Sequence, residues 1–284
     1  MARYRKILVA YDGSASAKHA LSLASQLARE NKSWIKVVAV VPTYEGDLEL
    51  IGVANIKETI TGPGKKLLAE AQDIAEREDV NILTNLEQGE PYEQIVHVAD
   101  DENCNLIVMG RRGQSNLERE FMGGVTARVI GHTSRDVLVI PDTAKLGWKN
   151  LLLATDGSPY SGAAVDKAID LAKEHNAKLT AISVVYSSDE FYTLGHEALR
   201  ELIEKAKAML AEIAGKAAAA GVKIETVVKE GEPHQAITDL AVDAGADMVV
   251  MGSHGRKGLT RLLMGSVTEK VIGFSQCPVL VSHL

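Results

Sequence analysis

The sequence of this chain contains one pattern twice. The pattern G-x2-G, nine residues and another glycine begins at Gly110 and again at Gly252. The stretch RKILVAYDGS at 5–14 likewise recurs as KNLLLATDGS at 149–158. A repeat of this length is too long for a solenoid unit, so it predicts two consecutive globular domains.

We place these domains at 1–144 and 145–284, with the polar segment DTAKLG at 142–147 between them. Each half has about 140 residues, which is enough to bury a core of its own. Hydrophobic residues make up 46% of the chain and charged residues 24%, a composition that is typical of globular proteins.

Composition argues against several classes of partner. The net charge of −7, with only three Phe and two Trp, makes nucleic acid an unexpected partner. The N-terminal sequence has no signal-peptide core, and no apolar run approaches membrane-spanning length, so we expect a cytoplasmic protein with no membrane contact. The two cysteines, Cys104 and Cys277, lack metal-ligand spacing, and Cys104 is expected near the core.

Apolar runs alternate with helical patterns through both halves. Runs of Val, Ile and Leu predict strands that are buried on both faces, and their alternation with helices predicts an α/β fold with a parallel, doubly wound sheet. The predicted strands are 6–11, 35–41, 81–86, 106–110, 137–140, 151–155, 179–185, 223–228, 248–252 and 279–281. The predicted helices are 15–30, 56–78, 92–101, 125–131, 161–175, 197–220, 234–244 and 266–273.

Proline and glycine refine these boundaries. The dipeptides Glu90-Pro91 and Glu232-Pro233 predict helix starts. The segment 62–64, Gly-Pro-Gly, follows no strand and predicts a turn at the start of a helix.

The ends of the first and fourth strands are where we expect a ligand. In doubly wound sheets the ligand lies beyond the carboxyl ends of the strands, where the strand order reverses. With the order 3-2-1-4-5, Asp156 and the loop from Gly252 would face one pocket. Glycines let backbone N–H groups approach an anion, and a helix N-terminus adds partial positive charge. We expect Ser266 at the N-cap of the next helix, and the loop to hold a polyphosphate.

These residues resemble a known family. The strand ends AYDGS and ATDGS, the G-x2-G-x9-G-S pattern and the terminal CPVLV strand are similar to universal stress proteins, over both halves. The spacing followed by serine resembles the ATP-binding branch of that family. The resemblance implies two Rossmann-like domains of the adenine nucleotide alpha hydrolase type, each a five-stranded parallel sheet of order 3-2-1-4-5 with helices on both faces. It also implies pairing of the domains through their fifth strands and association as a homodimer.

The resemblance further implies that ATP or another adenine nucleotide is the ligand. Asp156 would contact the adenine or its surroundings, and Val184 would line the base pocket. The residues that would hold ribose and phosphates are Gly252, Gly255, Gly265, Ser266 and the amide of Val267. The matching residues of the first half are Asp12, Val40, Gly110, Gly113 and Gly123. A bound triphosphate normally carries Mg²⁺, but no set of carboxylate ligands is apparent in the sequence.

The first half departs from this pattern at Gly124, which stands where Ser266 stands in the second half. Loss of that hydroxyl would cost the nucleotide on the order of 1 kcal/mol. The loops also differ in charge, because the second carries three cations and no acid, whereas the first carries three cations and two acids. These residues are Arg256, Lys257 and Arg261 in the second loop, and Arg111, Arg112, Arg119, Glu118 and Glu120 in the first. We therefore expect the second site to bind a triphosphate more strongly.

Three functions remain open. We favour an ATP-binding regulatory or stress-response protein whose nucleotide state alters its partners or oligomerisation. The alternatives are a slow ATPase or nucleotidyl transferase of related fold, and an interaction module without nucleotide. No Ser/His/Asp set or activated nucleophile is visible, and His254 is expected to be a solvated loop residue. Asp12 and Asp156 could also simply start the turn into the next helix.

Overall fold

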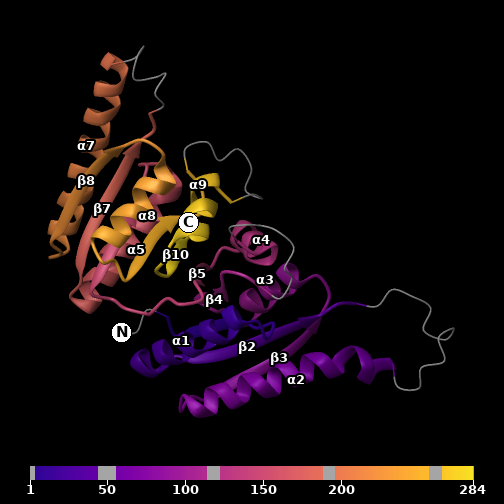
Figure 1. The fold of residues 1–284 in the computed structure, drawn as a ribbon. Coiled ribbons are helices and arrows are strands. Elements are labelled where there is room, and N and C mark those ends of the chain that lie inside the picture. Colours follow the sequence, from indigo (N-terminus) through magenta and orange to yellow (C-terminus); the bar gives the residue numbers. More distant parts are fainter. Residues whose placement is uncertain (1–3, 44–55, 114–121, 188–195, 256–263, 284) are drawn as a thin grey trace. The chain divides into compact units, whose positions relative to one another are not determined.

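The computed structural model describes residues 4–43, 56–113, 122–187, 196–255 and 264–283. Contacts within the chain divide it into two compact units, and the main division falls between Asp142 and Thr143. The first is unit 1 and the second is unit 2 (Figure 1).

Unit 1 is a parallel sheet of five strands with the order β3-β2-β1-β4-β5. Its elements are β1 (Lys6–Ala10), α1 (Ala15–Asn31), β2 (Trp34–Val41), α2 (Ile56–Arg77), β3 (Ile82–Gln88), α3 (Pro91–Asp101), β4 (Leu106–Gly110), α4 (Gly124–His132) and β5 (Asp136–Ile140). The predicted strand order is confirmed, and β1 lies beside β4 at the point where the order reverses.

Unit 2 repeats this topology with the order β8-β7-β6-β9-β10, again parallel throughout. Its elements are β6 (Asn150–Ala154), α5 (Pro159–His175), β7 (Lys178–Val185), α7 (His196–Ala219), β8 (Ile224–Glu230), α8 (Pro233–Asp243), β9 (Met248–Gly252), α9 (Ser266–Phe274) and β10 (Val279–Ser282). The α/β class and the two-domain repeat are thus confirmed.

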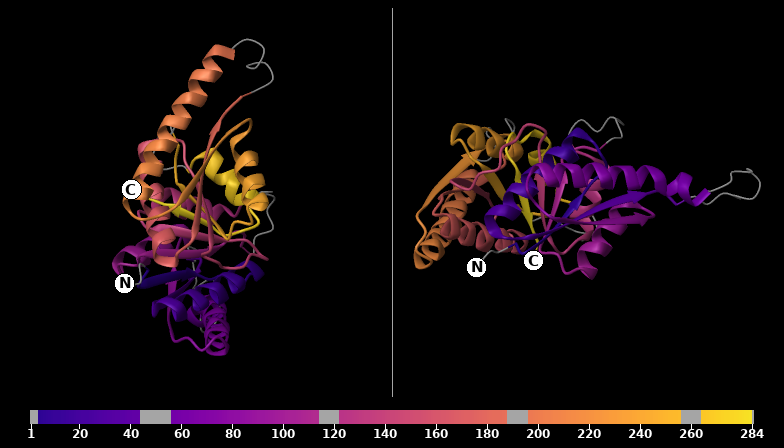
Figure 2. Two further views of the ribbon diagram at one scale, coloured as in Figure 1. Left: turned by 90° about the vertical axis from the view of Figure 1, so that its left-hand side faces the viewer. Right: turned by 90° about the horizontal axis from the view of Figure 1, so that it is seen from below.

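Helices cover both faces of each sheet. In unit 1, α1 packs with α2 on one face and α3 with α4 on the other (Figure 1). In unit 2, α8 packs with α9, and an ion pair between Lys216 and Asp166 joins α7 to α5. Figure 2 shows α7 extending beyond the end of β7.

Strands β4 and β9 are buried along their whole length, whereas the outer strands β3 and β8 are only partly buried. The centre of each sheet therefore carries the core, as the continuous apolar runs predict.

The predicted turn at 62–64 is wrong, because these residues lie inside α2. Pro63 has no N–H for a helical hydrogen bond, so its place in the helix has to be supported by other contacts. A Cβ atom on Gly64 would lie 2.3 Å from Leu86 Cδ1 and 2.7 Å from Val41 Cγ1. The glycine therefore allows α2 to approach the sheet closely, a tertiary contact that the local sequence does not reveal.

Candidate functional site

The first strand of each unit ends in the same turn. Asp12 Oδ1 accepts a hydrogen bond of 3.0 Å from the amide of Ser14, and Asp156 Oδ1 accepts one of 2.9 Å from Ser158. The two serines are the N-caps of α1 and α5, with hydroxyls that accept from amides three residues on. These two bonds confirm the proposed turn-forming role of both aspartates. Each bond uses the Oδ1 atom of its carboxylate.

The second carboxylate oxygen of each aspartate lies against the glycine loop. A Cβ atom on Gly113 would lie 2.7 Å from Asp12 Oδ2, and one on Gly255 would lie 2.9 Å from Asp156 Oδ2. Any side chain at these glycines would displace the carboxylate. The structure thus brings the end of the first strand and the loop after the fourth strand together in each unit, and it keeps the backbone there uncovered by a side chain.

At the strand-end glycines Gly110 and Gly252, the neighbouring helix leaves no room for a side chain. A Cβ atom on Gly252 would lie 2.7 Å from the carbonyl oxygen of Tyr160 in α5. One on Gly110 would lie 2.7 Å from the carbonyl carbon of Ser16 in α1. Backbone atoms of a packed helix cannot move aside easily, so helix packing alone explains glycine at both positions.

The third glycine of each pattern closes the loop. Gly123 donates its amide to Arg111 O and Gly265 donates to Ser253 O, each at 2.9 Å. A Cβ atom on Gly265 would also lie 3.6 Å from the amide nitrogen of Gly255. The two ends of the nine-residue segment are therefore adjacent, with the glycine backbones facing each other. The loop cations Arg256, Lys257 and Arg261, and residues 118–120 of the first loop, lie outside the described residues.

Ser266 is not the N-cap, contrary to our expectation. Gly265 is the N-cap of α9, with φ −63° and ψ 138°, and Ser266 is the first helical residue and exposed. In unit 1, Gly123 caps α4 and Gly124 is the first helical residue. Glycine and serine are both acceptable N-caps, so the sequence alone could not separate these two registers.

Both helix starts present their first-turn amides without a side-chain cap. Neither Gly123 nor Gly265 offers a hydroxyl or carboxylate, and no side chain caps α4 or α9. The amide of Val267 belongs to this first turn. An uncapped helix N-terminus favours an anion, because its N–H groups and the helix dipole both point positive charge outward.

A threonine missed by sequence analysis fixes each helix start to its sheet. Thr126 Oγ1 donates to Gly110 O at 3.2 Å, and Thr268 Oγ1 donates to Gly252 O at 3.0 Å. Both threonines are buried. The signal was present in the sequence, since Val-Thr follows both Gly124 and Ser266.

The two valines carried over from the family lie one residue before the ends of β2 and β7. Val40 and Val184 are half-buried, whereas Val41 and Val185, which follow them, are buried. Side chains alternate between faces along a strand, and Val41 faces Gly64 of α2. Val40 therefore faces the opposite side of the sheet, where α3 and α4 lie, and Val184 has the same place in unit 2.

The residues between the first two glycines of each pattern differ between the units. In unit 2, Ser253 Oγ lies 3.0 Å from His254 Nδ1, and the imidazole lies 5.5 Å from the ring of Tyr160. His254 is half-buried, so our expectation of a solvated loop histidine is wrong. Unit 1 has Arg111 and Arg112 at these positions. Burial lowers the pKa of Arg111, and the nearby Asp142 opposes that shift.

Within the described residues, no group of three His, Cys, Asp or Glu side chains is arranged to hold a metal ion. No helix in the described part of the chain is both long and apolar enough to cross a bilayer.

Comparison with known proteins assigns both halves of the chain to one family. The model of the universal stress protein family matches residues 3–141 and again residues 147–283. The chain belongs to the universal stress protein family. A universal stress protein of Methanocaldococcus jannaschii is 42% identical over an alignment of 139 residues, which covers 47% of this chain and 81% of that protein. Such a relative corresponds to one unit, so this chain is a tandem member.

The fold of almost the whole chain is similar to that of a solved structure. A universal stress protein from Archaeoglobus fulgidus covers 98% of this chain and 96% of its own, at 21% identity with a TM-score of 0.72. That likeness concerns the fold. Another universal stress protein, solved in complex with cAMP, covers 49% of this chain and 97% of its own, at 25% identity with a TM-score of 0.40.

Proposed function

We propose that this tandem universal stress protein binds ATP, and that its nucleotide state alters its partners or its oligomerisation. The observation that carries the proposal is the contact between Gly255 and Asp156 Oδ2 beside the uncapped start of α9. This arrangement offers an anion several backbone amides and a helix dipole at one end of the sheet.

The base and the phosphates would lie on different parts of this site. Asp156 and Val184 stand at the ends of neighbouring strands β6 and β7, where an adenine ring could contact a half-buried apolar side chain. The residues that would hold the ribose and phosphates are Gly252, Gly255, Gly265, Ser266 and the amide of Val267. Arg256 would add positive charge. Mg²⁺ would be bound by the oxygens of the triphosphate.

We propose that unit 2 holds the stronger site. The Ser266 hydroxyl is exposed at the first helical position and is available to a phosphate oxygen, whereas Gly124 of unit 1 has no such group. Asp12, Val40, Gly110, Gly113 and Gly123 would form a weaker site of the same plan.

Gly265→Val tests this assignment. The Cβ atom alone would lie 3.4 Å from His254 Cα and from Ser253 O, which is ordinary contact, so the fold should tolerate the change. The added methyl groups would cover the amides that face the ligand, so ATP binding at unit 2 should be lost in calorimetry. Unit 1 is silenced in the same experiment by Gly123→Val.

Gly215→Val is the matched control. It adds the same atoms near the C-terminal end of α7, where nothing lies within 4 Å of the new Cβ atom. It should leave ATP affinity unchanged. Unchanged affinity in the Gly265→Val, Gly123→Val protein would refute the site, and phosphate release in excess of bound nucleotide would favour the ATPase alternative.

The assembly of the chain is a separate proposal, made from its sequence. The fifth strand of each domain is apolar, and an open apolar edge attracts another strand, so we propose that the domains pair through these strands. The further proposal that two chains form a homodimer rests on the family resemblance alone. Leu138→Lys with Leu280→Lys should make the segment 142–147 sensitive to protease. Scattering that showed the wild-type domains moving as independent bodies would contradict the pairing.

A further inference from the structure

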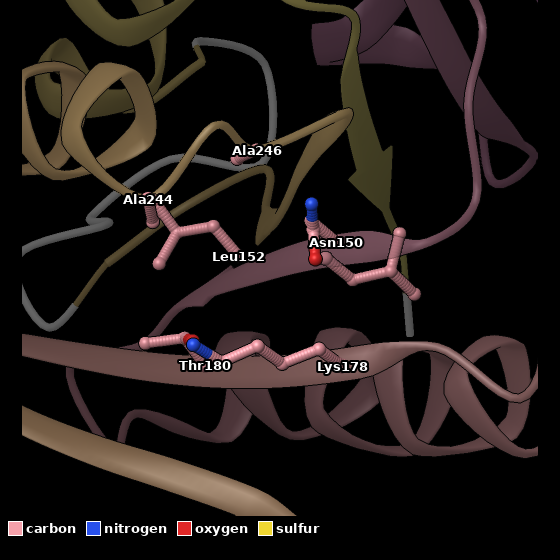
Figure 3. A pocket seen from close by; sticks show the side chains of 7 residues that line it. Asn150, Leu152, Lys178, Thr180, Ala244 and Ala246 are labelled. Atoms are coloured by element: carbon pink, nitrogen blue, oxygen red, sulfur yellow. The ribbon is translucent and has the colours of Figure 1, made fainter.

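The amino-terminal end of the sheet in unit 2 contains a hollow. It has a main cavity of about 270 Å³ and a small adjoining one of about 10 Å³, and Ala246 lines both. Lys145, Ala241, Val242, Asp247 and Cys277 are among the residues of the main cavity. Figure 3 shows the small one, with Asn150 and Thr180 on neighbouring strands and Ala244 and Ala246 after α8. This hollow lies at the opposite end of the strands from the proposed nucleotide site.

Unit 1 fills the same place with charged side chains. Lys36 on β2 pairs with Glu102 after α3, and Arg135 Nε lies 2.9 Å from Asp100 Oδ1. At the equivalent positions of the repeat, unit 2 has Thr180 and Ala244 in place of the first pair, and Cys277 and Val242 in place of the second. The register supports this equivalence, because Leu8 pairs with Lys36 and Leu152 pairs with Thr180. Lysine, glutamate and arginine have been replaced by the shorter threonine, alanine and cysteine, which leaves the hollow, and apolar Val242 stands in place of Asp100.

The walls of the main cavity combine apolar, cationic and thiol groups. Ala241 is buried and Val242 is 54% exposed, so the wall is apolar and open to solvent. Lys145 is exposed, and among the described residues it has no hydrogen-bond or ion-pair partner. Asp247 is already engaged, since its Oδ2 accepts from the amides of Lys149 and Asn150 at 2.7 and 2.9 Å. A cation with no partner among the described residues therefore lines the same cavity as a half-buried thiol.

We propose that this hollow is a binding site for small disulfides that carry a carboxylate, and that Cys277 exchanges with them. The Cys277 thiolate attacks one sulfur of the disulfide, a new S–S bond forms to Cys277, and the other half leaves as a thiolate. The thiol proton passes to solvent, and no further oxidant is needed. Lys145 attracts the carboxylate, and Val242 and Ala241 contact the hydrocarbon part.

The surroundings of the thiol set the pH at which exchange proceeds. Burial raises the pKa of Cys277, and Asp247 adds to this, while the hydrogen bond with Ser275 opposes it. Lys145 and Asp247 are the charged side chains that line the cavity with it. Because the thiolate is the nucleophile, exchange is slow at neutral pH and accelerates as the pH rises toward and past the ordinary thiol value of about 8.5.

Two probes of matched size test the proposal on the full chain. Dithiodipropionate carries a carboxylate on each half, whereas bis(2-hydroxyethyl) disulfide is uncharged. Intact-mass and peptide mass spectrometry should show modification of Cys277 and none of Cys104, which is only 2% exposed. The charged probe should react about fivefold faster, the size expected for one charge pair close to water.

Variants separate the cavity from simple exposure of a thiol. Lys145→Gln should remove the preference for the charged probe and leave the rate with the neutral probe unchanged, whereas Lys149→Gln, outside the cavity, should change neither. Val242→Asp restores the residue of unit 1 and should slow both probes, the charged one more. Equal rates for both probes in the wild type, equal modification of both cysteines, or reaction only in urea would overturn the proposal.

Discussion

At the carboxyl ends of their strands the two units make the same contacts, whereas at the amino ends they do not. Each unit has an aspartate against a loop glycine, a glycine amide that closes the loop, and a threonine bonded to the strand-end carbonyl. At the other end, the pair of Arg135 with Asp100 in unit 1 corresponds to Cys277 and Val242 in unit 2. The ends that share a geometry are those where we place the shared function, and the ends that differ allow separate ones.

Even at the carboxyl ends the units differ in the residues around the shared backbone. Tyr11 stands before the aspartate of unit 1, and its hydroxyl donates to Glu70 of α2 at 2.9 Å. Thr155 stands there in unit 2 and donates to Ser161 of α5 at 3.0 Å. The same strand end is thus held by a different helix in each unit. Substitutions at these paired positions can show which differences affect binding and which affect only stability.

The largest expected effect concerns the strand-end glycines. Gly252→Ala would place a Cβ atom 2.7 Å from Tyr160 O, so α5 has to shift, and we expect a loss of about 1–3 kcal/mol in unfolding free energy. Gly162→Ala is the control within α5, because nothing lies within 4 Å of its new Cβ atom. Denaturant titration measures both. Equal stability of the two variants would show that Gly252 is not required by packing.

A smaller effect is expected from exchanging the first helical residues. Ser266→Gly should weaken ATP binding at unit 2, and Gly124→Ser should strengthen it at unit 1, each by about tenfold or less, because one neutral hydrogen bond is worth roughly 1 kcal/mol. Calorimetry on chains with the other site silenced gives each Kd. Indistinguishable affinities of the two wild-type sites would contradict the proposal that unit 2 binds ATP more strongly than unit 1.

The smallest effect is expected at the strand end of unit 1. Lys18, at 2.6 Å, and the Tyr11 hydroxyl hold the pKa of Glu70 below its usual range. A carboxyl with a lowered folded pKa adds stability above its unfolded pKa, and that stability is lost as the pH falls through the folded value. Tyr11→Phe should therefore cost about 1 kcal/mol at neutral pH, with partial exposure of Glu70 keeping the effect modest.

The pH dependence distinguishes this hydrogen bond from simple packing. The difference between wild type and Tyr11→Phe should shrink below about pH 4, where the carboxylate becomes protonated. Thr155→Val, the matched change in unit 2, involves no carboxylate and should show a difference that does not vary with pH over this range. Parallel pH profiles for the two variants would argue against a bond to ionised Glu70.

The sequence was sufficient for the architecture because its signals are local and repeated. Apolar runs located every described strand, and Pro91 and Pro233 stand at the helix starts they predict, with Glu90 and Glu232 as N-caps. The errors arose where tertiary contacts decide. Gly64 lies inside α2, at a point where Val41 and Leu86 leave no room for a Cβ atom.

Two features of the sites were also beyond sequence reasoning. The register at Gly265 could not be fixed, since glycine and serine both cap helices. The hollow beside Cys277 could not be predicted either, because it depends on ion pairs between segments that are distant in the chain, present in one unit and absent from the other.

The most direct test of the central claim is the nucleotide that the protein carries. The full chain is purified without added nucleotide, denatured, and the released small molecules are identified by mass spectrometry and counted against protein. We predict an adenine nucleotide, ATP foremost, with its amount reduced far more by Gly265→Val than by Gly123→Val. Release of no nucleotide, together with no heat on titration of ATP with Mg²⁺ into the wild-type chain, would contradict the account.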